Sequence, residues 1–293
     1  MMKTINPDNF QFNMQAPAKI NYVLEVLERR EDGYHEINTV YQTISFYDHL
    51  YFQETNRDIE VLTDSDELQD PLANLVFKSA SLVARMKNVN KGAKIFLRKN
   101  IPIGAGLGGG SSDAACTLKG LNRLWKLNLT ELELQNYAAQ IGADVPFFLR
   151  GGLAIGKGKG DKITYISRGM RPKFPIILVC PTFKVSTADA YMEWDEGGYF
   201  SRGSGLDSFM KSLYGRNLMG MAGNLFNDFE ALIIKKHSPI QAIKNRLMRS
   251  GALGALMTGS GSAVFGIFEN MNLSDDVLNN LMKLGRVVRA TTI

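Results

Sequence analysis

Hydrophobic and polar positions alternate over residues 18–26, AKINYVLEV. Apolar side chains share one face of this segment, at Ile20, Tyr22, Leu24 and Val26. Polar side chains share the opposite face, at Lys19, Asn21 and Glu25. Because successive side chains of a strand point to opposite faces, the pattern predicts a half-buried strand whose polar face is available for chemistry.

Strand and helix patterns follow one another through the first half of the chain. β-Branched and aromatic residues after the Asp32-Gly33 turn predict strands over YHEINTVYQTISFYDHLYFQ. Apolar residues recur at helical spacing over 74–87, and the short strand KIFLRK then leads into a glycine-rich segment. Helical spacing resumes after the glycines, and a further helix is predicted over 131–141. The segment GGLAIGKGKGDKI is typical of a hairpin.

The second half of the chain opens on the strand PIILVC, and residues 195–205 form its clearest loop. Helices are predicted over 224–236 and 239–249, the second with Ser238 as N-cap and Pro239 at its first position. The strands GALMT and AVFGIF flank a Gly/Ser turn, and a helix over 275–284 precedes the last strand, RVVRA. These elements predict an α+β protein of two domains, residues 1–165 and residues 166–293.

Composition narrows the class of protein without identifying it. The 293 residues are 45% hydrophobic and 22% charged, as in an ordinary soluble globular protein, with a formal net charge of +5. The basic residues form no run, so we expect no nucleic-acid partner. Cys116 and Cys180 are far apart in the sequence, which argues against a disulfide framework or a zinc site. The start of the chain lacks a signal-like apolar core, and we expect a cytoplasmic protein without a membrane partner.

The segment GAGLGGGSSDAA, residues 104–115, carries the G-x-G-x-x-G spacing of a dinucleotide-binding fingerprint. The segment before it, FLRKNIPIG, is too polar for the buried strand that this fold requires, and the acidic residues Glu131 and Glu133 fall in a helix. A Walker loop is also excluded, because no Lys-Ser/Thr pair follows the glycines. Five glycines among residues 104–110, leading into a helix, instead favour a cradle for an anion such as phosphate. The alternative is a flexible loop capped by Ser111 or Ser112.

Four other segments carry residues that suit chemistry, and each has a plainer interpretation. Asp144 in GADVP is a candidate base, or else the N-cap of the helix that VPFFL would form. Lys19 is a candidate cation on the polar strand face, or else a solvated lysine. Tyr34 and His35 follow a turn, where an exposed tyrosine and a satisfied histidine are common. The segment TGSGSA, residues 258–263, is either part of a binding site or a tight hairpin.

Six segments of the chain, which follow one another in the order typical of the family, resemble the GHMP kinases. These are ATP-dependent kinases of small molecules. IPIGAGLGGGSSDAA looks like their ATP loop, and APAKIN and TGSGSAVFGIF fit the same superfamily. DGYHEINTVYQTI, GADVPFFLRGGLAIGKGKG and GNLFNDFE narrow the resemblance to the 4-diphosphocytidyl-2-C-methyl-D-erythritol kinase family of non-mevalonate isoprenoid biosynthesis. The resemblance implies an N-terminal domain like the second domain of ribosomal protein S5 and a ferredoxin-like C-terminal domain.

The resemblance also implies roles for individual residues in phosphorylating the 2-hydroxyl of the cytidine diphosphate substrate. It makes Asp144 the base and Lys19 its cationic partner. It assigns ATP to the loop Pro102, Ile103, Gly104, Ala105, Gly106, Leu107, Gly108, Gly109, Gly110, Ser111 and Ser112. It assigns the substrate to Asn21, Tyr34, His35, Thr187, Tyr191, Gly259, Ser260 and Gly261, with His35 reading cytosine between the rings of Tyr34 and Tyr191.

Some parts of this expectation remain open in the sequence. CPTFKVSTADAY departs from the commoner Pro-Gly pattern of the family, which weakens the assignment of Thr187 and Tyr191. Mg²⁺ is implied by ATP chemistry, yet no acidic or histidine cluster indicates its ligands, so phosphates and water would hold it. The alternatives are another GHMP kinase, acting on mevalonate, homoserine or a sugar, or a nucleotide-binding regulator that has lost catalysis. The protein is expected to be a monomer or a homodimer.

Overall fold

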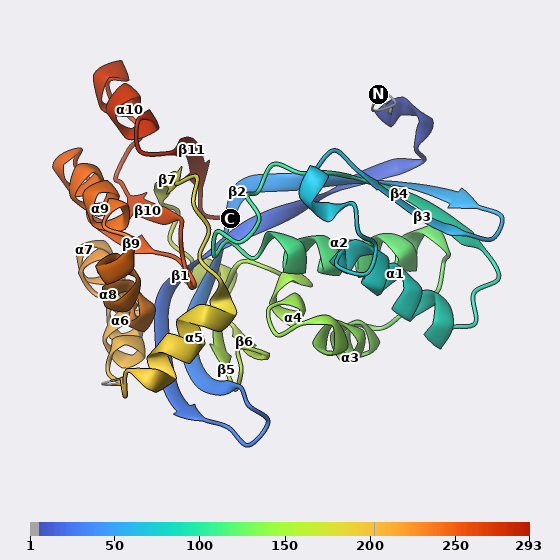
Figure 1. The fold of residues 1–293 in the computed structure, drawn as a ribbon, viewed down its shortest axis with the longest axis horizontal. Coiled ribbons are helices and arrows are strands. Elements are labelled where there is room, and N and C mark those ends of the chain that lie inside the picture. The colour runs from blue at the N-terminus through green and yellow to red at the C-terminus, as the bar shows by residue number, and fades with distance from the viewer. Residues whose placement is uncertain (1–5, 202) are drawn as a thin grey trace. The chain divides into compact units, whose positions relative to one another are not determined.

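A computed structural model describes residues 6–201 and 203–293, and it divides into two compact units (Figure 1). Unit 1 takes its described residues from Met1–Ala18, Tyr47–Ile101 and Gly109–Arg150. Unit 2 consists of Lys19–Phe46, Pro102–Gly108 and the described residues of Gly151–Ile293. The long strands β1 (Phe12–Arg29) and β2 (His35–Thr55) contribute residues to both units.

Unit 1 combines strands and helices. The C-terminal part of β2 pairs antiparallel with β4 (Gly92–Arg98), and β4 pairs parallel with β3 (Ile59–Thr63). Its helices are α1 (Leu75–Met86), α2 (Gly109–Leu124), α3 (Glu131–Ile141) and α4 (Val145–Phe148), with short 3₁₀ turns at Pro7–Asn9 and Asp66–Leu68. A Cβ on Gly120 of α2 would lie 2.3 Å from the ring of Phe52 on β2, so this glycine lets the helix pack directly on the strand.

Unit 2 contains a four-stranded antiparallel sheet in the order β11-β7-β10-β9. These strands are β7 (Pro175–Cys180), β9 (Gly254–Met257), β10 (Val264–Ile267) and β11 (Arg286–Thr291). In the same unit β5 (Leu153–Lys157) and β6 (Lys162–Tyr165) form a hairpin against β2, and β8 (Phe226–Asn227) pairs parallel with β1. The helices are α5 (Thr187–Glu196), α6 (Gly205–Tyr214), α7 (Leu218–Gly223), α8 (Asp228–Lys236), α9 (Pro239–Arg249) and α10 (Asp275–Met282), with a 3₁₀ turn at Arg168–Met170.

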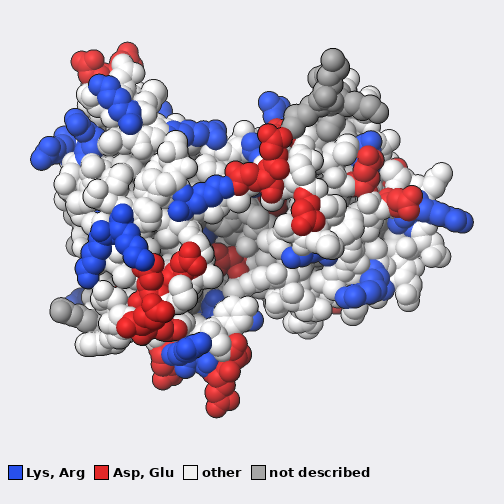
Figure 2. Space-filling view, viewed as in Figure 1, with Lys and Arg blue, Asp and Glu red and all other residues white. Residues whose placement is uncertain are grey.

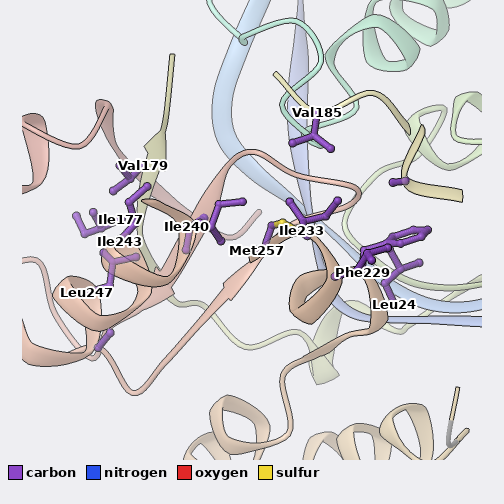
Figure 3. Packing of buried hydrophobic residues seen from close by; sticks show 14 of the residues in the cluster. Leu24, Ile177, Val179, Val185, Phe229, Ile233, Ile240, Ile243, Leu247 and Met257 are labelled. Carbon is purple, nitrogen blue, oxygen red and sulfur yellow. The ribbon is translucent and has the colours of Figure 1, made fainter. Parts of the chain in front are cut away.

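The core of unit 2 lies where α8 and α9 pack on this sheet (Figure 3). Ile240, Ile243 and Leu247 recur at helical spacing along α9 and are fully buried. They belong to one apolar cluster with Ile177 and Val179 of the central strand β7. This packing holds β9 and β10, and therefore the turn between them, in a fixed position.

The predicted α+β fold is confirmed, and so are the helices over 131–141 and 239–249. The helix expected over 224–236 begins only at Asp228, because Phe226 pairs with β1 and the side chain of Asn227 accepts the N–H of Phe229. The loop expected over 195–205 is shorter than predicted, since α5 continues to Glu196 and α6 starts at Gly205; Arg202 lies outside the described residues. The helices α5, α6 and α7 were not anticipated. The domain boundary near residue 165 stays a prediction.

Charges of both signs are interspersed on the face of the molecule shown in Figure 2. Within the described residues, no helix is long and apolar enough to cross a membrane. The two cysteines, Cys116 and Cys180, are buried free thiols, and burial raises the pKa of each to about 12.

Candidate active site

The polar face of β1 is buried in unit 2. Lys19 is 4% exposed and Asn21 is 2% exposed, which excludes the interpretation of Lys19 as a solvated lysine. The ammonium of Lys19 donates to Asn21 Oδ1 at 2.6 Å and lies 5.6 Å from the centre of the Tyr41 ring. A charged group buried this deeply needs hydrogen-bond acceptors, so β1 places an ammonium where its position is fixed by neighbours.

Glycine residues make room for the Tyr41 ring beside Lys19. A Cβ on Gly156 would lie 2.6 Å from the Tyr41 ring, and one on Gly160 would lie 2.5 Å from its hydroxyl. Tyr41 in turn donates to the carbonyl of Gly160 at 3.4 Å. Two glycines of GGLAIGKGKGDKI therefore have a packing role that the hairpin prediction did not contain.

The glycine loop of residues 102–108 packs against the turn formed by residues 258–263. Gly104, Gly106 and Gly108 have positive φ angles of 71°, 77° and 67°. A Cβ on Gly106 would lie 2.1 Å from the carbonyl oxygen of Thr258, so only glycine fits there. The N–H of Ala263 donates to the carbonyl of Ala105 at 3.2 Å. The 258–263 turn is therefore a β9–β10 hairpin turn that also supports the glycine loop.

Lys19 is tied to the same loop through its backbone. Its N–H donates to the carbonyl of Leu107 at 2.9 Å. Thr258 lies between the two, because its hydroxyl accepts the N–H of Asn21 at 3.0 Å and is 3.4 Å from the carbonyl of Gly106. Unit 2 thus gathers a buried ammonium, an amide and the glycine loop.

In unit 1, helix α2 begins with two glycines, Gly109 and Gly110. The helix begins at Gly109, so Ser111 and Ser112 lie in its first turn and neither is the residue that precedes it. The alternative in which one of them caps the helix is therefore wrong. A Cβ on Gly109 would lie 2.9 Å from the side chain of Ile101. The N–H groups of a first helical turn have no partner within the helix and form a common binding site for anions.

A buried ion cluster supports the start of α2. Lys99 Nζ donates to Asp48 at 2.5 Å and to Asp113 at 2.8 Å, and all three side chains are at most 7% exposed. Asp48 also accepts the backbone N–H groups of Asn100 and Ile101. Burial raises the pKa of Asp113 well above its usual value, which the ammonium of Lys99 only partly offsets. These residues form no recognisable sequence motif, because Lys99 lies 51 and 14 positions from its two partners along the chain.

Asp144 lies at the N-cap position of α4, with Pro146 near the start of the helix. Its side chain makes no capping hydrogen bond, and its backbone is helical rather than extended. A carboxylate that capped the helix would accept an N–H of the first turn. The structural role proposed for Asp144 as an N-cap is therefore not supported.

His35 and Tyr191 are brought together, whereas Tyr34 makes a different contact. The rings of His35 and Tyr191 stack with centres 5.0 Å apart, and His35 Nε2 lies 2.7 Å from a carboxylate oxygen of Asp195. Tyr34 is 55% exposed, with Lys159 Nζ 4.8 Å from the centre of its ring. His35 and Asp195 also line an open pocket of about 680 Å³ with Trp194, Tyr199 and Phe200.

The remaining predicted substrate residues lie at the 258–263 turn. Thr187, at the start of α5, shares a hydrogen bond of 2.8 Å with Ser260. Gly259 and Gly261 on either side have positive φ angles of 58° and 92°. The structure thus joins the STADAY segment to the Gly/Ser turn, although the two are 73 residues apart along the chain.

Family models match two parts of the chain. Residues 74–152 match the model described as GHMP kinases N terminal domain, and residues 209–286 match GHMP kinases C terminal.

Similar proteins and structures carry related names. A 4-diphosphocytidyl-2-C-methyl-D-erythritol kinase of Caldanaerobacter subterraneus subsp. tengcongensis is 40% identical over 263 residues, 89% of either chain. One from Enterococcus faecalis is 39% identical over 91% of this chain and 93% of its own. A crystal structure of 4-(cytidine 5'-diphospho)-2C-methyl-D-erythritol kinase aligns with a TM-score of 0.81 and 31% identity, covering 96% of this chain and 99% of the other. The mevalonate kinase of L. major shares the fold at 17% identity, with a TM-score of 0.71 and 96% of each chain covered.

Proposed function

Because this chain belongs to the 4-diphosphocytidyl-2-C-methyl-D-erythritol kinase family of the GHMP kinases, we propose that it phosphorylates 4-diphosphocytidyl-2-C-methyl-D-erythritol with ATP. The acceptor is the 2-hydroxyl, and the reaction is a step of non-mevalonate isoprenoid precursor biosynthesis. The observation that carries the proposal is the buried Lys19, whose backbone is bonded to the glycine loop, in a chain so similar to these kinases. The cytoplasmic location and the monomeric or homodimeric state remain predictions.

The glycine loop and the first turn of α2 suit the phosphates of ATP. Glycines at positive φ expose backbone N–H groups without a side chain in the way, and the start of α2 adds unpaired N–H groups and the positive end of its dipole. The hydroxyl of Ser112, within this first turn, is buried and has no hydrogen-bond partner among the described residues. A buried hydroxyl without a partner is costly, so a bound phosphate oxygen would satisfy it. These features support residues 102–112 as the ATP loop.

Mg²⁺ has fewer candidate ligands. In the described ranges 6–201 and 203–293, no group of three His, Cys, Asp or Glu side chains could hold a metal ion. We propose that nucleotide phosphates and water mainly hold the Mg²⁺ ion, which is common for this cation. When bound there, it would offset the negative charge of the phosphates.

The two proposed catalytic residues have complementary roles. Phosphoryl transfer passes through a loose transition state and depends on positioning and charge stabilisation more than on covalent chemistry. We assign Asp144 to orient the 2-hydroxyl and accept its proton, which suits a carboxylate that is not used as a helix cap. We assign Lys19 to offset the negative charge that develops on the transferred group.

Recognition of the cytidine moiety is assigned to His35, with Tyr34 and Tyr191 on the faces of the base. Asp195 accepts from Nε2 of His35, so a hydrogen bond from His35 to a ligand has to use Nδ1. The stacked pair of His35 and Tyr191 supports a shared role for these two rings. Thr187, Ser260 and the flanking glycines Gly259 and Gly261 are proposed to contact the rest of the substrate. Asn21 is proposed as a further substrate contact.

The test is an ADP-release assay with a panel of alcohols. Purified protein, ATP and Mg²⁺ are incubated with 4-diphosphocytidyl-2-C-methyl-D-erythritol, mevalonate, homoserine or a sugar. We expect rapid turnover only with the cytidine-bearing alcohol. Turnover of another alcohol at a higher kcat/KM would assign the protein to a different GHMP kinase activity. ATP binding without turnover of any alcohol would assign it to nucleotide-dependent regulation.

A further inference from the structure

Both ends of the Asn21 amide are hydrogen-bonded to neighbours in unit 2. Its Oδ1 accepts from Lys19 Nζ at 2.6 Å, and its Nδ2 donates to the hydroxyl of Thr39 at 2.8 Å. Thr39 is fully buried on β2, and its hydroxyl donates to the carbonyl of Val23 at 2.7 Å. The result is a buried chain of hydrogen bonds from a backbone carbonyl to the ammonium.

Each end of this series of hydrogen bonds allows the hydrogens to be donated in only one direction. The carbonyl of Val23 can only accept, so the single hydroxyl hydrogen of Thr39 is committed to it. The oxygen of Thr39 must then accept, and the group that faces it has to be the NH₂ of Asn21. The ammonium of Lys19 can only donate, and it requires an oxygen at the other side of the same amide.

The contacts of Thr258 are compatible with the same orientation. Its hydroxyl accepts the backbone N–H of Asn21 at 3.0 Å, which leaves its hydrogen to donate. The acceptors in reach are Asn21 Oδ1 at 3.2 Å and the carbonyl of Gly106 at 3.4 Å. A reversed amide would place NH₂ against both the ammonium and this hydroxyl. The network therefore admits one orientation of Asn21.

We propose that Thr39 is a positioning residue for the kinase reaction: its hydroxyl fixes the amide of Asn21 so that Oδ1 holds the ammonium of Lys19. The inference rests on the proposed function in that Lys19 is taken to stabilise the transferred phosphoryl group. The bond to Asn21 uses one of the three N–H donors of the ammonium, so it sets the directions in which the other two point. Thr39 itself touches neither reactant.

The test compares substitutions that separate the hydroxyl from the volume of Thr39. Thr39→Val keeps the shape and removes the hydroxyl, which frees the amide of Asn21 to rotate. We expect kcat to fall about 10- to 100-fold, as misplacement of a catalytic group does, with the KM values for both substrates changed less than about threefold. Thr39→Ser restores the hydroxyl and should recover most of the kcat. Thr39→Ala takes the place of the valine variant if that protein does not fold.

Thr292→Val is the matched control. The hydroxyl of Thr292 is also buried, donates to the carbonyl of Pro172 at 2.9 Å and accepts the N–H of Phe174 at 2.9 Å. Loss of the Thr292 hydroxyl should lower the melting temperature about as much as loss of the Thr39 hydroxyl does. If only a hydroxyl near Lys19 matters for the reaction, kcat of Thr292→Val stays within about twofold of wild type.

Lys19→Met separates failure of this inference from failure of the proposed function. If Lys19→Met keeps wild-type kcat, the proposed role of Lys19 fails. If Lys19→Met loses activity but Thr39→Val does not, the positioning role of Thr39 is wrong. A double variant gives the sharpest result, because Thr39→Val should cost no further kcat once Lys19 is Met. An additive loss in the double variant would show that Thr39 acts by another route.

Discussion

Gly106 gives a direct test of how the glycine loop is supported. A Cβ at this position, at φ +77°, would lie 2.1 Å from the carbonyl oxygen of Thr258. Gly104 has nearly the same angle, φ +71°, yet a Cβ there would meet only the side chain of Lys184, at 3.6 Å. Gly104→Ala therefore carries backbone strain alone. Gly106→Ala carries the same strain and also collides with the 258–263 turn.

The two variants should differ by the free energy of that collision. A non-glycine residue in the left-handed region costs about 1–2 kcal/mol, which applies to both variants. Forcing a methyl group into occupied space costs roughly 1–3 kcal/mol more, and here the obstacle is backbone that cannot rotate away. Separation of the loops would also weaken the hydrogen bond from the N–H of Ala263 to the carbonyl of Ala105. At roughly 2–4 °C per kcal/mol, Gly106→Ala should melt several degrees below Gly104→Ala.

The assay is thermal unfolding of the ligand-free protein, followed by circular dichroism for wild type and both variants. Without ATP, the comparison reports on the protein alone, since any direct contact of Gly104 with phosphate is absent. ATP titration of the folded variants then shows whether the displaced loop binds more weakly. Equal melting temperatures for the two variants would refute the close packing of the glycine loop on Thr258.

Four further predictions test other parts of the structure. Asp144→Asn should lower kcat by about 10²–10⁴ through loss of general-base catalysis, with ATP affinity unchanged by calorimetry; wild-type turnover would remove Asp144 from the reaction. His35→Ala should weaken binding of CDP in isothermal titration while ATP binding stays the same, and CDP that competes with ATP would place the cytidine site elsewhere. Tyr22→Phe should raise the melting temperature, because the Tyr22 hydroxyl is buried without a hydrogen-bond partner among the described residues and its removal relieves up to about 1–3 kcal/mol; a lower melting temperature would contradict this. Asp48→Asn should destabilise the protein more than Asp113→Asn, because Asp48 accepts from both Lys99 and backbone N–H groups, whereas burial favours the neutral form of Asp113; the reverse order of melting temperatures would contradict this account.

The local sequence pattern was sufficient to predict elements whose apolar residues recur at a regular spacing. The strand over residues 18–26 is present as predicted, but both of its faces are buried rather than one. The helix over 131–141 is also present, and a Thr130–Glu133 capping box starts it. The start of α8 could not be placed, since it is set by the pairing of Phe226 with Val23, about 200 residues earlier. The same holds for α6, where the buried carboxylate of Glu25 accepts the N–H groups of Gly205 and Leu206 at the start of the helix. A contact between distant segments leaves no periodic signal.

In the candidate site, too, only the residues with a local sequence signal could be predicted. The glycine spacing at 104–110 indicated a phosphate loop, and the polar face of β1 indicated Lys19 and Asn21. Thr39, Thr258 and Asp195 were not identified, because their roles depend on hydrogen bonds to residues far away in the chain. A threonine in a strand is commonplace, and only its partners distinguish a positioning residue from a packing one.

The position of the transferred phosphate tests the central claim most directly. The protein is incubated with ATP, Mg²⁺ and 4-diphosphocytidyl-2-C-methyl-D-erythritol, and the products are observed by phosphorus NMR, with Asp144→Asn as the control. Carbon 2 of this substrate bears a methyl group and no hydrogen, so a phosphate on the 2-hydroxyl has no three-bond coupling to a proton. The account predicts a new phosphomonoester resonance that stays a singlet without proton decoupling. A proton-coupled multiplet, or no new resonance while ATP is bound, would contradict it.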